Sequence, residues 1–136
     1  MRNIITLSSM LLLLTIAAFG APPQSAMLNT NISAAAARAM MAKDTNVIVL
    51  DVRCPREYND ERIGNTPLMP LQFLERKINE LNQYKKKKII VYCHSGNRSE
   101  LAVEILREYG FNALNMEGGI LQWKANRFPT ISGGAR

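Results

Sequence analysis

The stretch VYCHSGNRSE, residues 91–100, decides how the rest of the chain is interpreted. An apolar run ends in Cys93, and a short polar loop containing Gly96 leads into a segment typical of a helix. The cysteine has four candidate roles, as a buried apolar residue, a disulfide partner, a metal ligand or a nucleophile. The neighbouring segments have to discriminate among them.

Short apolar runs alternate along the chain with segments that carry helix signals. The runs VIVLDV, KIIVYC and FNALNM, at residues 47–52, 88–93 and 111–116, predict strands buried on both faces. Helices are predicted after the capping residue Ser33, at residues 34–43, for one turn at 55–58, and at 71–84, 99–109 and 119–125. This alternation predicts one α/β domain with a central parallel sheet, helices on both faces and right-handed crossovers.

Two of these helices have a predicted apolar face. The first face consists of Leu71, Leu74, Ile78 and Leu81. The second consists of Leu101, Ala102, Ile105, Leu106 and Tyr109, and Gly110 ends that helix.

The first 20 residues have the three-part plan of a secretory signal peptide. Arg2 precedes an apolar run at residues 10–19, and small residues follow, so we expect cleavage before Ala21. The apolar run is shorter than the roughly 20 residues that a permanent membrane span needs, so no stable span remains after cleavage. We therefore expect an exported protein, periplasmic or secreted, with a leader at 21–31, a domain at 32–128 and a C-terminal tail at 129–136. A buried helix of a cytosolic protein is the alternative.

The composition limits the ligands that the chain is expected to bind. It has 136 residues and a net charge of +6, which suits small anionic substrates and does not indicate nucleic acid. The run KKKK, residues 85–88, is typical of a solvated turn before a strand. Two cysteines and one histidine are too few for a structural zinc site, so we expect no metal and no cofactor, in a monomeric protein.

Cys93 ends a predicted central strand, and ligands of parallel sheets bind beyond the carboxyl ends of strands. We therefore expect its sulfur to open onto that crevice. Backbone N–H groups of the loop, together with the start of the helix at Ser99, favour a thiolate and an anionic substrate. These features point to a nucleophile.

Four motifs in order resemble those of the rhodanese sulfurtransferases. VIVLDVRCPREY is similar to the strand motif of that family, and RIGNTPLMPL to the motif that follows it. VYCHSGNRS matches the active-site loop Cys-x-x-Gly-x-Arg, and MEGGILQWK resembles the closing Gly-Gly-x-x-x-Trp motif. A single such domain behind a signal peptide is similar to the periplasmic phage-shock members of the family. Three positions depart from the pattern: Arg62 stands where His is usual, Asn65 where Gly is usual, and Cys54 where Thr or Ser is commoner.

The resemblance implies sulfur transfer through a persulfide on Cys93. A small anionic donor such as thiosulfate would supply the sulfur, and cyanide or a thiol would accept it. The amides of His94, Ser95, Gly96, Asn97 and Arg98 would bind the substrate. His94 would act as a base or shape the loop mouth, and we favour the loop mouth; Arg98 would either bind the anion or tie the loop to a carboxylate.

Three other residues are candidates for supporting roles. Asp51 and Arg53 form either a buried structural ion pair or part of the catalytic site, and we favour the ion pair. Cys54 either packs locally or acts as a redox partner of Cys93, and we favour local packing.

Two other classes of protein are the alternatives. Phosphatases and arsenate reductases use a related loop with five residues between Cys and Arg, whereas HSGN provides four. A non-catalytic binding module of the same fold often lacks the cysteine, which this chain has. Sulfurtransferase is the function that we favour.

Overall fold

The computed structural model describes residues 29–133 of the chain. The predicted signal peptide, residues 1–20, and residues 21–28 of the predicted leader lie outside the described residues, as do residues 134–136. Within the described range, no helix has the length and apolar composition needed to cross a bilayer.

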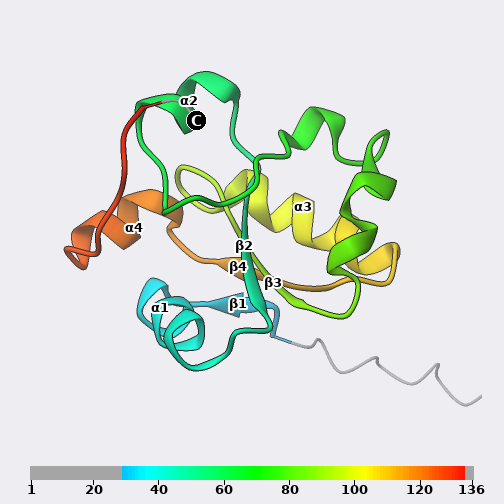
Figure 1. Cartoon of the computed structure of the whole chain (residues 1–136), viewed down its shortest axis with the longest axis horizontal. Coiled ribbons are helices and arrows are strands. Elements are labelled where there is room, and N and C mark those ends of the chain that lie inside the picture. The colour runs from blue at the N-terminus through cyan, green and yellow to red at the C-terminus, as the bar shows by residue number, and fades with distance from the viewer. Residues whose placement is uncertain (1–28, 134–136) are drawn as a thin grey trace, which may run out of the picture.

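Parallel strands form the centre of the fold (Figure 1). The described strands are β1 (Asn31–Ile32), β2 (Val47–Asp51), β3 (Lys88–Tyr92) and β4 (Asn112–Met116). They lie in the order β1-β4-β3-β2, and every neighbouring pair is parallel. β3 is therefore a central strand, as the sequence predicts, and β2 and β4 lie on either side of it.

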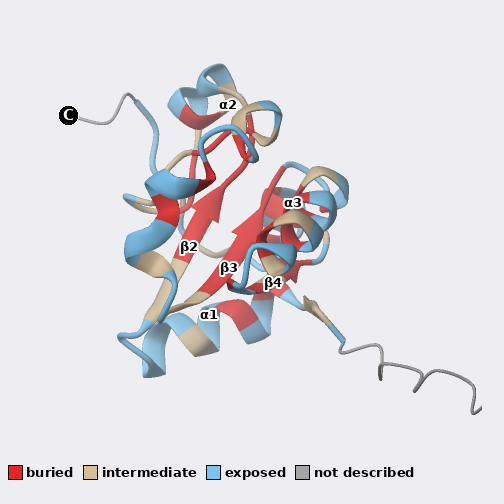
Figure 2. Cartoon of the chain, turned by 90° about the vertical axis from the view of Figure 1, so that its right-hand side faces the viewer, coloured by how far each residue is buried: buried red, intermediate tan, exposed pale blue. Residues whose placement is uncertain are grey.

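Helices cover both faces of this sheet. Along β3, Ile89, Val91 and the following Cys93 face one core, whereas Ile90 and Tyr92 face the other. The first core is closed by α3 (Asn97–Glu108) and by the 3₁₀ helices η1 (Leu71–Phe73) and η2 (Ile78–Tyr84); the second is closed by α1 (Ala34–Lys43) and α4 (Gly119–Ala125). Most of β2, β3 and β4 is buried between these layers (Figure 2). The predicted fold class is confirmed.

α2 (Pro55–Asp60) follows β2 at the carboxyl end of the sheet. It has Pro55 at its start, as predicted, because the missing N–H and the fixed φ of proline suit the first turn. The loop after β3 and the start of α4 lie at the same end of the molecule (Figure 1). Three connections thus meet beyond the carboxyl ends of the strands.

The prediction of a single helix at residues 71–84 is wrong. The structure has two 3₁₀ helices there, joined by turns. Leu71 and Leu74 are three residues apart, as are Ile78 and Leu81. That spacing aligns side chains in a 3₁₀ helix, where residues i and i+3 eclipse, as well as in an α-helix.

The buried face predicted for α3 is also partly wrong. Leu101 and Tyr109 are exposed, whereas Ser99 and Val103 are buried together with the expected Ala102 and Leu106. The polar Ser99 points inward to hydrogen-bond acceptors around Cys93, and this fixes the rotation of the helix.

Two segments outside the predicted elements are paired. β1 spans the boundary between the predicted leader and the predicted domain, where the backbone N–H of Asn115 donates to the Thr30 carbonyl (2.7 Å) and that of Glu117 to the Ile32 carbonyl (2.9 Å). In the predicted C-terminal tail, Ile131 forms an antiparallel bridge with Arg62. Very short strands of this kind leave no periodic signal in a sequence.

Candidate active site

Cys93 follows the last residue of β3 and lies beneath the loop that leads into α3. We expected the sulfur to open onto the crevice beyond the strands. The side chain is instead enclosed, and only 1% of the residue is exposed. The Gly96 amide donates to Sγ at 3.0 Å, and the amides of Ser95 and Ser99 also point to the sulfur. These converging donors include two of the five amides predicted to bind the substrate, those of Ser95 and Gly96, together with that of Ser99.

Glycines allow the loop to close around the sulfur. Gly96 has a φ of +107°, and a Cβ there would approach the Gly118 amide to 3.1 Å. A Cβ on Gly119 would collide with the carbonyl oxygens of Cys93 and His94. These two carbonyls accept hydrogen bonds from the first amides of α4, Ile120 (2.9 Å) and Leu121 (3.2 Å). The Gly-Gly turn thus packs closely against the loop, and the start of α4 holds the loop through these two hydrogen bonds.

The surroundings of Cys93 favour its ionised form. Burial alone raises the pKa of the thiol, but hydrogen bonds from the Ser99 hydroxyl and from the amides of Ser99, Gly96 and Ser95 outweigh it. The net result is a pKa below the ordinary thiol value. A thiolate held by amides is the reactive form of cysteine.

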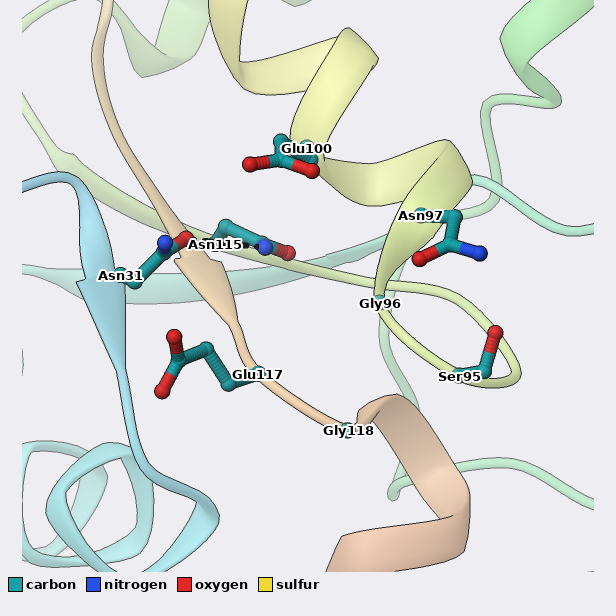
Figure 3. Close-up of a pocket in the computed structure, with 8 residues that line it drawn as sticks. All are labelled: Asn31, Ser95, Gly96, Asn97, Glu100, Asn115, Glu117 and Gly118. Atoms are coloured by element: carbon teal, nitrogen blue, oxygen red, sulfur yellow. Dashed lines mark hydrogen bonds between the residues drawn. The ribbon is translucent and has the colours of Figure 1, made fainter.

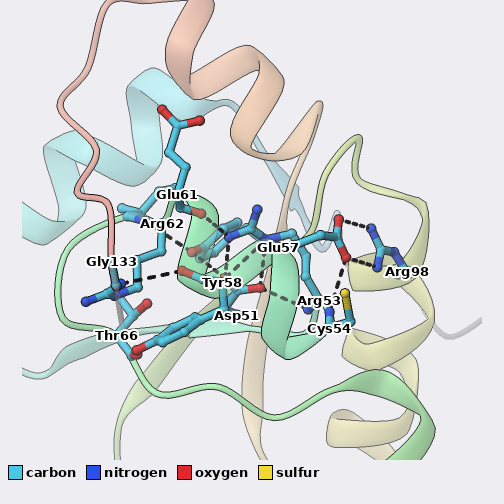
Figure 4. Close-up of polar contacts among 12 residues, drawn as sticks. Asp51, Arg53, Cys54, Glu57, Tyr58, Glu61, Arg62, Thr66, Arg98 and Gly133 are labelled. Carbon is cyan, nitrogen blue, oxygen red and sulfur yellow. Dashed lines mark hydrogen bonds and ion pairs between the residues drawn. The ribbon is translucent and has the colours of Figure 1, made fainter. Parts of the chain in front are cut away.

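Arg98 ties the loop to α2 (Figure 4). Its guanidinium forms a bidentate pair with Glu57, with distances of 2.8 and 2.9 Å. Glu57 also accepts the Cys54 amide at 3.1 Å. The pair with Arg98 lowers the pKa of Glu57 to about 2. Of the two roles considered for Arg98, the structure therefore has the contact with a carboxylate, and Glu57 is a partner that sequence reasoning missed.

Asp51 and Arg53 form a buried ion pair, with Nη2 and Oδ2 2.7 Å apart. The Tyr92 hydroxyl donates to the same Asp51 oxygen (2.7 Å) and accepts the Ile63 amide (3.1 Å). Arg53 also donates to the Glu61 carbonyl (2.7 Å). The structure thus contains the buried ion pair that we favoured for Asp51 and Arg53. Tyr92 was not predicted, because its face of the strand reads as apolar.

The remaining loop side chains line two surface pockets. His94 lies on the rim of a pocket of about 330 Å³, together with Arg53, Arg98, Leu121 and Lys124. Ser95 and Asn97 line a second pocket of about 250 Å³ on the other side of the loop (Figure 3). Both side chains are exposed, so the loop contributes its amides to the sulfur and presents its side chains to solvent.

Two residues near Cys93 were missed as site residues. The Ser99 hydroxyl lies 3.4 Å from Sγ and 2.6 Å from Oδ1 of Asn115, which is itself buried. A polar residue inside a run that predicts a buried strand, as in FNALNM, is the signal that points to Asn115.

Cys54 is half-buried, and both it and Cys93 are free thiols in the structure. Cys54 precedes α2 beside Glu57 and Arg98 (Figure 4). Its thiol hydrogen bond is one of the contacts that lower the pKa of Glu57.

Comparison with known proteins defines the class to which this site belongs. The family model for the rhodanese-like domain matches residues 33–126. The chain belongs to the rhodanese-like domain family.

Curated relatives include proteins named for sulfur chemistry. An uncharacterized protein of Synechocystis is 34% identical over 108 residues, covering 79% of this chain and 59% of the relative. The putative sulfur carrier protein YrkF of Bacillus subtilis is 34% identical over 93 residues, covering 68% of this chain and 49% of YrkF. The chain thus spans about half the length of these two relatives. A protein of Allochromatium vinosum named sulfurtransferase is 28% identical over 93 residues, covering 68% of this chain and 85% of the relative.

Solved structures have the same fold. A rhodanese-related protein from Thermoplasma volcanium is 36% identical with a TM-score of 0.68, and the match covers 74% of this chain and 96% of that one.

Proposed function

We propose that the protein is a sulfurtransferase that carries a sulfane sulfur as a persulfide on Cys93. The observation that carries this proposal is the set of loop amides that converge on a buried sulfur at the end of a central strand. An ordinary buried cysteine would have apolar neighbours and no such donors. The names of the relatives in Allochromatium and Bacillus support the same chemistry.

The transfer runs in two displacements. The Cys93 thiolate attacks the outer sulfur of thiosulfate, a sulfur–sulfur bond forms, and sulfite leaves with the electron pair of the broken bond. Cyanide, or a thiolate, then attacks the outer sulfur of the persulfide and regenerates the Cys93 thiolate. The loop amides stabilise the negative charge on the transferred sulfur in both steps. No additional oxidant or reductant is needed.

Steady-state assays of the purified protein test this proposal. We expect thiocyanate formation from thiosulfate and cyanide with ping-pong kinetics. Cys93→Ser should abolish it, because serine keeps the shape but cannot hold a persulfide. Cys54→Ser is the matched control and should retain activity. Turnover by the Cys93→Ser variant at the rate of the unmodified protein would contradict the assignment.

The same preparation tests the two alternative functions. Four residues separate Cys93 from Arg98, so the loop offers few amides for a phosphoryl group, and phosphate monoesters should not be hydrolysed. Phosphatase activity equal to the sulfur transfer would favour the phosphatase alternative. A protein that binds sulfur donors without any turnover would favour the binding module.

Export to the periplasm or the extracellular space is a second proposal, supported by Arg2 and the apolar run at residues 10–19. N-terminal sequencing of the protein from the exported fraction should begin at Ala21. Recovery in the cytosol with an intact N-terminus at Met1 would contradict export.

A further inference from the structure

Asn31 and Asn115 line the second pocket (Figure 3), and a short chain of polar side chains leads from them to the nucleophile. Asn31 of β1 accepts a hydrogen bond from the Asn115 side-chain amide at 3.0 Å. The Asn115 carbonyl oxygen lies 2.6 Å from the Ser99 hydroxyl, which lies 3.4 Å from the Cys93 sulfur. The inner three residues are all buried.

The Ser99 hydroxyl has one proton and three acceptors within reach. Asn115 Oδ1 at 2.6 Å is the shortest contact, followed by the Gly96 carbonyl at 3.0 Å and the Cys93 sulfur at 3.4 Å. The hydroxyl can donate to only one of them at full strength. A neutral thiol is a weak acceptor for this proton, whereas a thiolate is a stronger one because hydrogen bonds to ionised groups are stronger. Ionisation of Cys93 therefore sets up a competition with Asn115.

Asn31 decides which end of the Asn115 amide takes part in this competition. Because Asn31 presents its oxygen, the Asn115 NH₂ group turns toward Asn31 and the carbonyl oxygen turns toward Ser99. With the opposite orientation, the NH₂ group would donate to Ser99 and leave the hydroxyl proton free for the sulfur. A residue of the two-residue strand β1 is thus linked to the reactive sulfur.

We propose that Asn115, oriented by Asn31, is a positioning residue that competes with the Cys93 sulfur for the Ser99 proton. It thereby limits how readily Cys93 ionises. This inference rests on the proposed role of Cys93 as the nucleophile.

The charged and titratable groups around Cys93 stay unchanged in the test. Arg98 at the start of α3 interacts electrostatically with Cys93 and Cys54 and is paired with Glu57 of α2. His94 lies in the loop, and Glu100 and Glu117 line the second pocket. The β2 carboxylate Asp51 is paired with Arg53.

The test is a titration of Cys93 that does not depend on sulfur transfer. In a Cys54→Ser background, the β-carbon NMR shift of isotope-labelled Cys93 is followed against pH. Asn115→Leu removes the competing oxygen at similar size, so the midpoint should move to lower pH. Well below the midpoint, the thiolate fraction should rise about two- to tenfold, as expected for one redirected hydrogen bond. Ser99→Ala should move the midpoint to higher pH.

The double variant shows whether Asn115 acts through Ser99. Adding Asn115→Leu to Ser99→Ala should cause no further change in the midpoint. Asn31→Ala, at a half-buried site that perturbs the core less, should change the midpoint in the same direction as Asn115→Leu. Asn112→Ala, at the exposed start of the same strand, is the control and should leave it unchanged.

Two outcomes would overturn this inference. One is an unchanged or raised midpoint in both Asn115→Leu and Asn31→Ala. The other is a shift caused by Asn115→Leu that is equally large in the Ser99→Ala background. A protein that titrates as expected but never forms a persulfide would support this inference and contradict the proposed function.

Discussion

Replacing Glu57 by Gln tests how strongly the loop is held to α2. Glu57 and Arg98 form a bidentate pair at 2.8 and 2.9 Å, and the carboxylate also accepts the Cys54 amide. Gln keeps the size and an acceptor for that amide but removes the charge. The variant therefore isolates the ionic part of the contact.

The pKa of Glu57 sets the expected magnitude. A fall from 4.5 to about 2, caused first by the hydrogen bonds from Arg98, corresponds to about 3 kcal/mol at 1.36 kcal/mol per pKa unit. The side chains are 29% and 40% exposed, and solvent screening of such a pair reduces this to about 1 kcal/mol. Glu57→Gln should lower the free energy of unfolding by that amount near neutral pH.

The pH dependence follows from the direction of the change. Because the folded-state pKa lies below the unfolded value, the stabilisation is present above about 4.5 and is lost as the pH falls toward about 2. The difference between Glu57→Gln and the unmodified protein should therefore shrink across this range.

Urea denaturation at a series of pH values measures this difference, with Glu104→Gln as the control. Glu104 is an exposed carboxylate on α3, so its replacement should change stability by less than about 0.5 kcal/mol. Equal stability of the two variants near neutral pH would refute the reasoning, as would a difference that persists at low pH.

Three further predictions concern other parts of the site. Tyr92→Phe should destabilise the fold by about 1–3 kcal/mol, because Asp51 loses a donor and a buried amide loses its acceptor; Tyr109→Phe, at an exposed position, should have almost no effect in the same denaturation assay. The Gly119→Ala variant should unfold at a far lower denaturant concentration than the Gly64→Ala variant. Both glycines have positive φ, which costs about 1–2 kcal/mol, but only at Gly119 would the Cβ strike backbone atoms. Thiol counting on the unreduced protein should find both cysteines free under mild oxidant, whereas a loss of both thiols that reductant reverses would establish a redox switch.

The fold was predictable because its signals are local. Continuous apolar runs mark β2, β3 and β4, and glycines, prolines and the cap Ser33 mark the breaks between elements. The position of Cys93 at the end of a central strand follows from the same alternation.

The missed features depend on contacts between segments far apart in sequence. Glu57 and Arg98 are 41 residues apart, and Asn31 and Asn115 are 84 residues apart, so no spacing rule relates them. β1 is too short for a periodic pattern. The rotation of α3 depends on Ser99, whose inward position is explained by acceptors on the loop and on β4.

The central claim, that Cys93 carries the transferred sulfur, is tested most directly by mass spectrometry of the protein after treatment with thiosulfate. We predict a gain of the mass of one sulfur atom on the peptide that contains Cys93, reversed by cyanide and absent in Cys93→Ser. No added mass, or added sulfur only on the peptide that contains Cys54, would contradict the account.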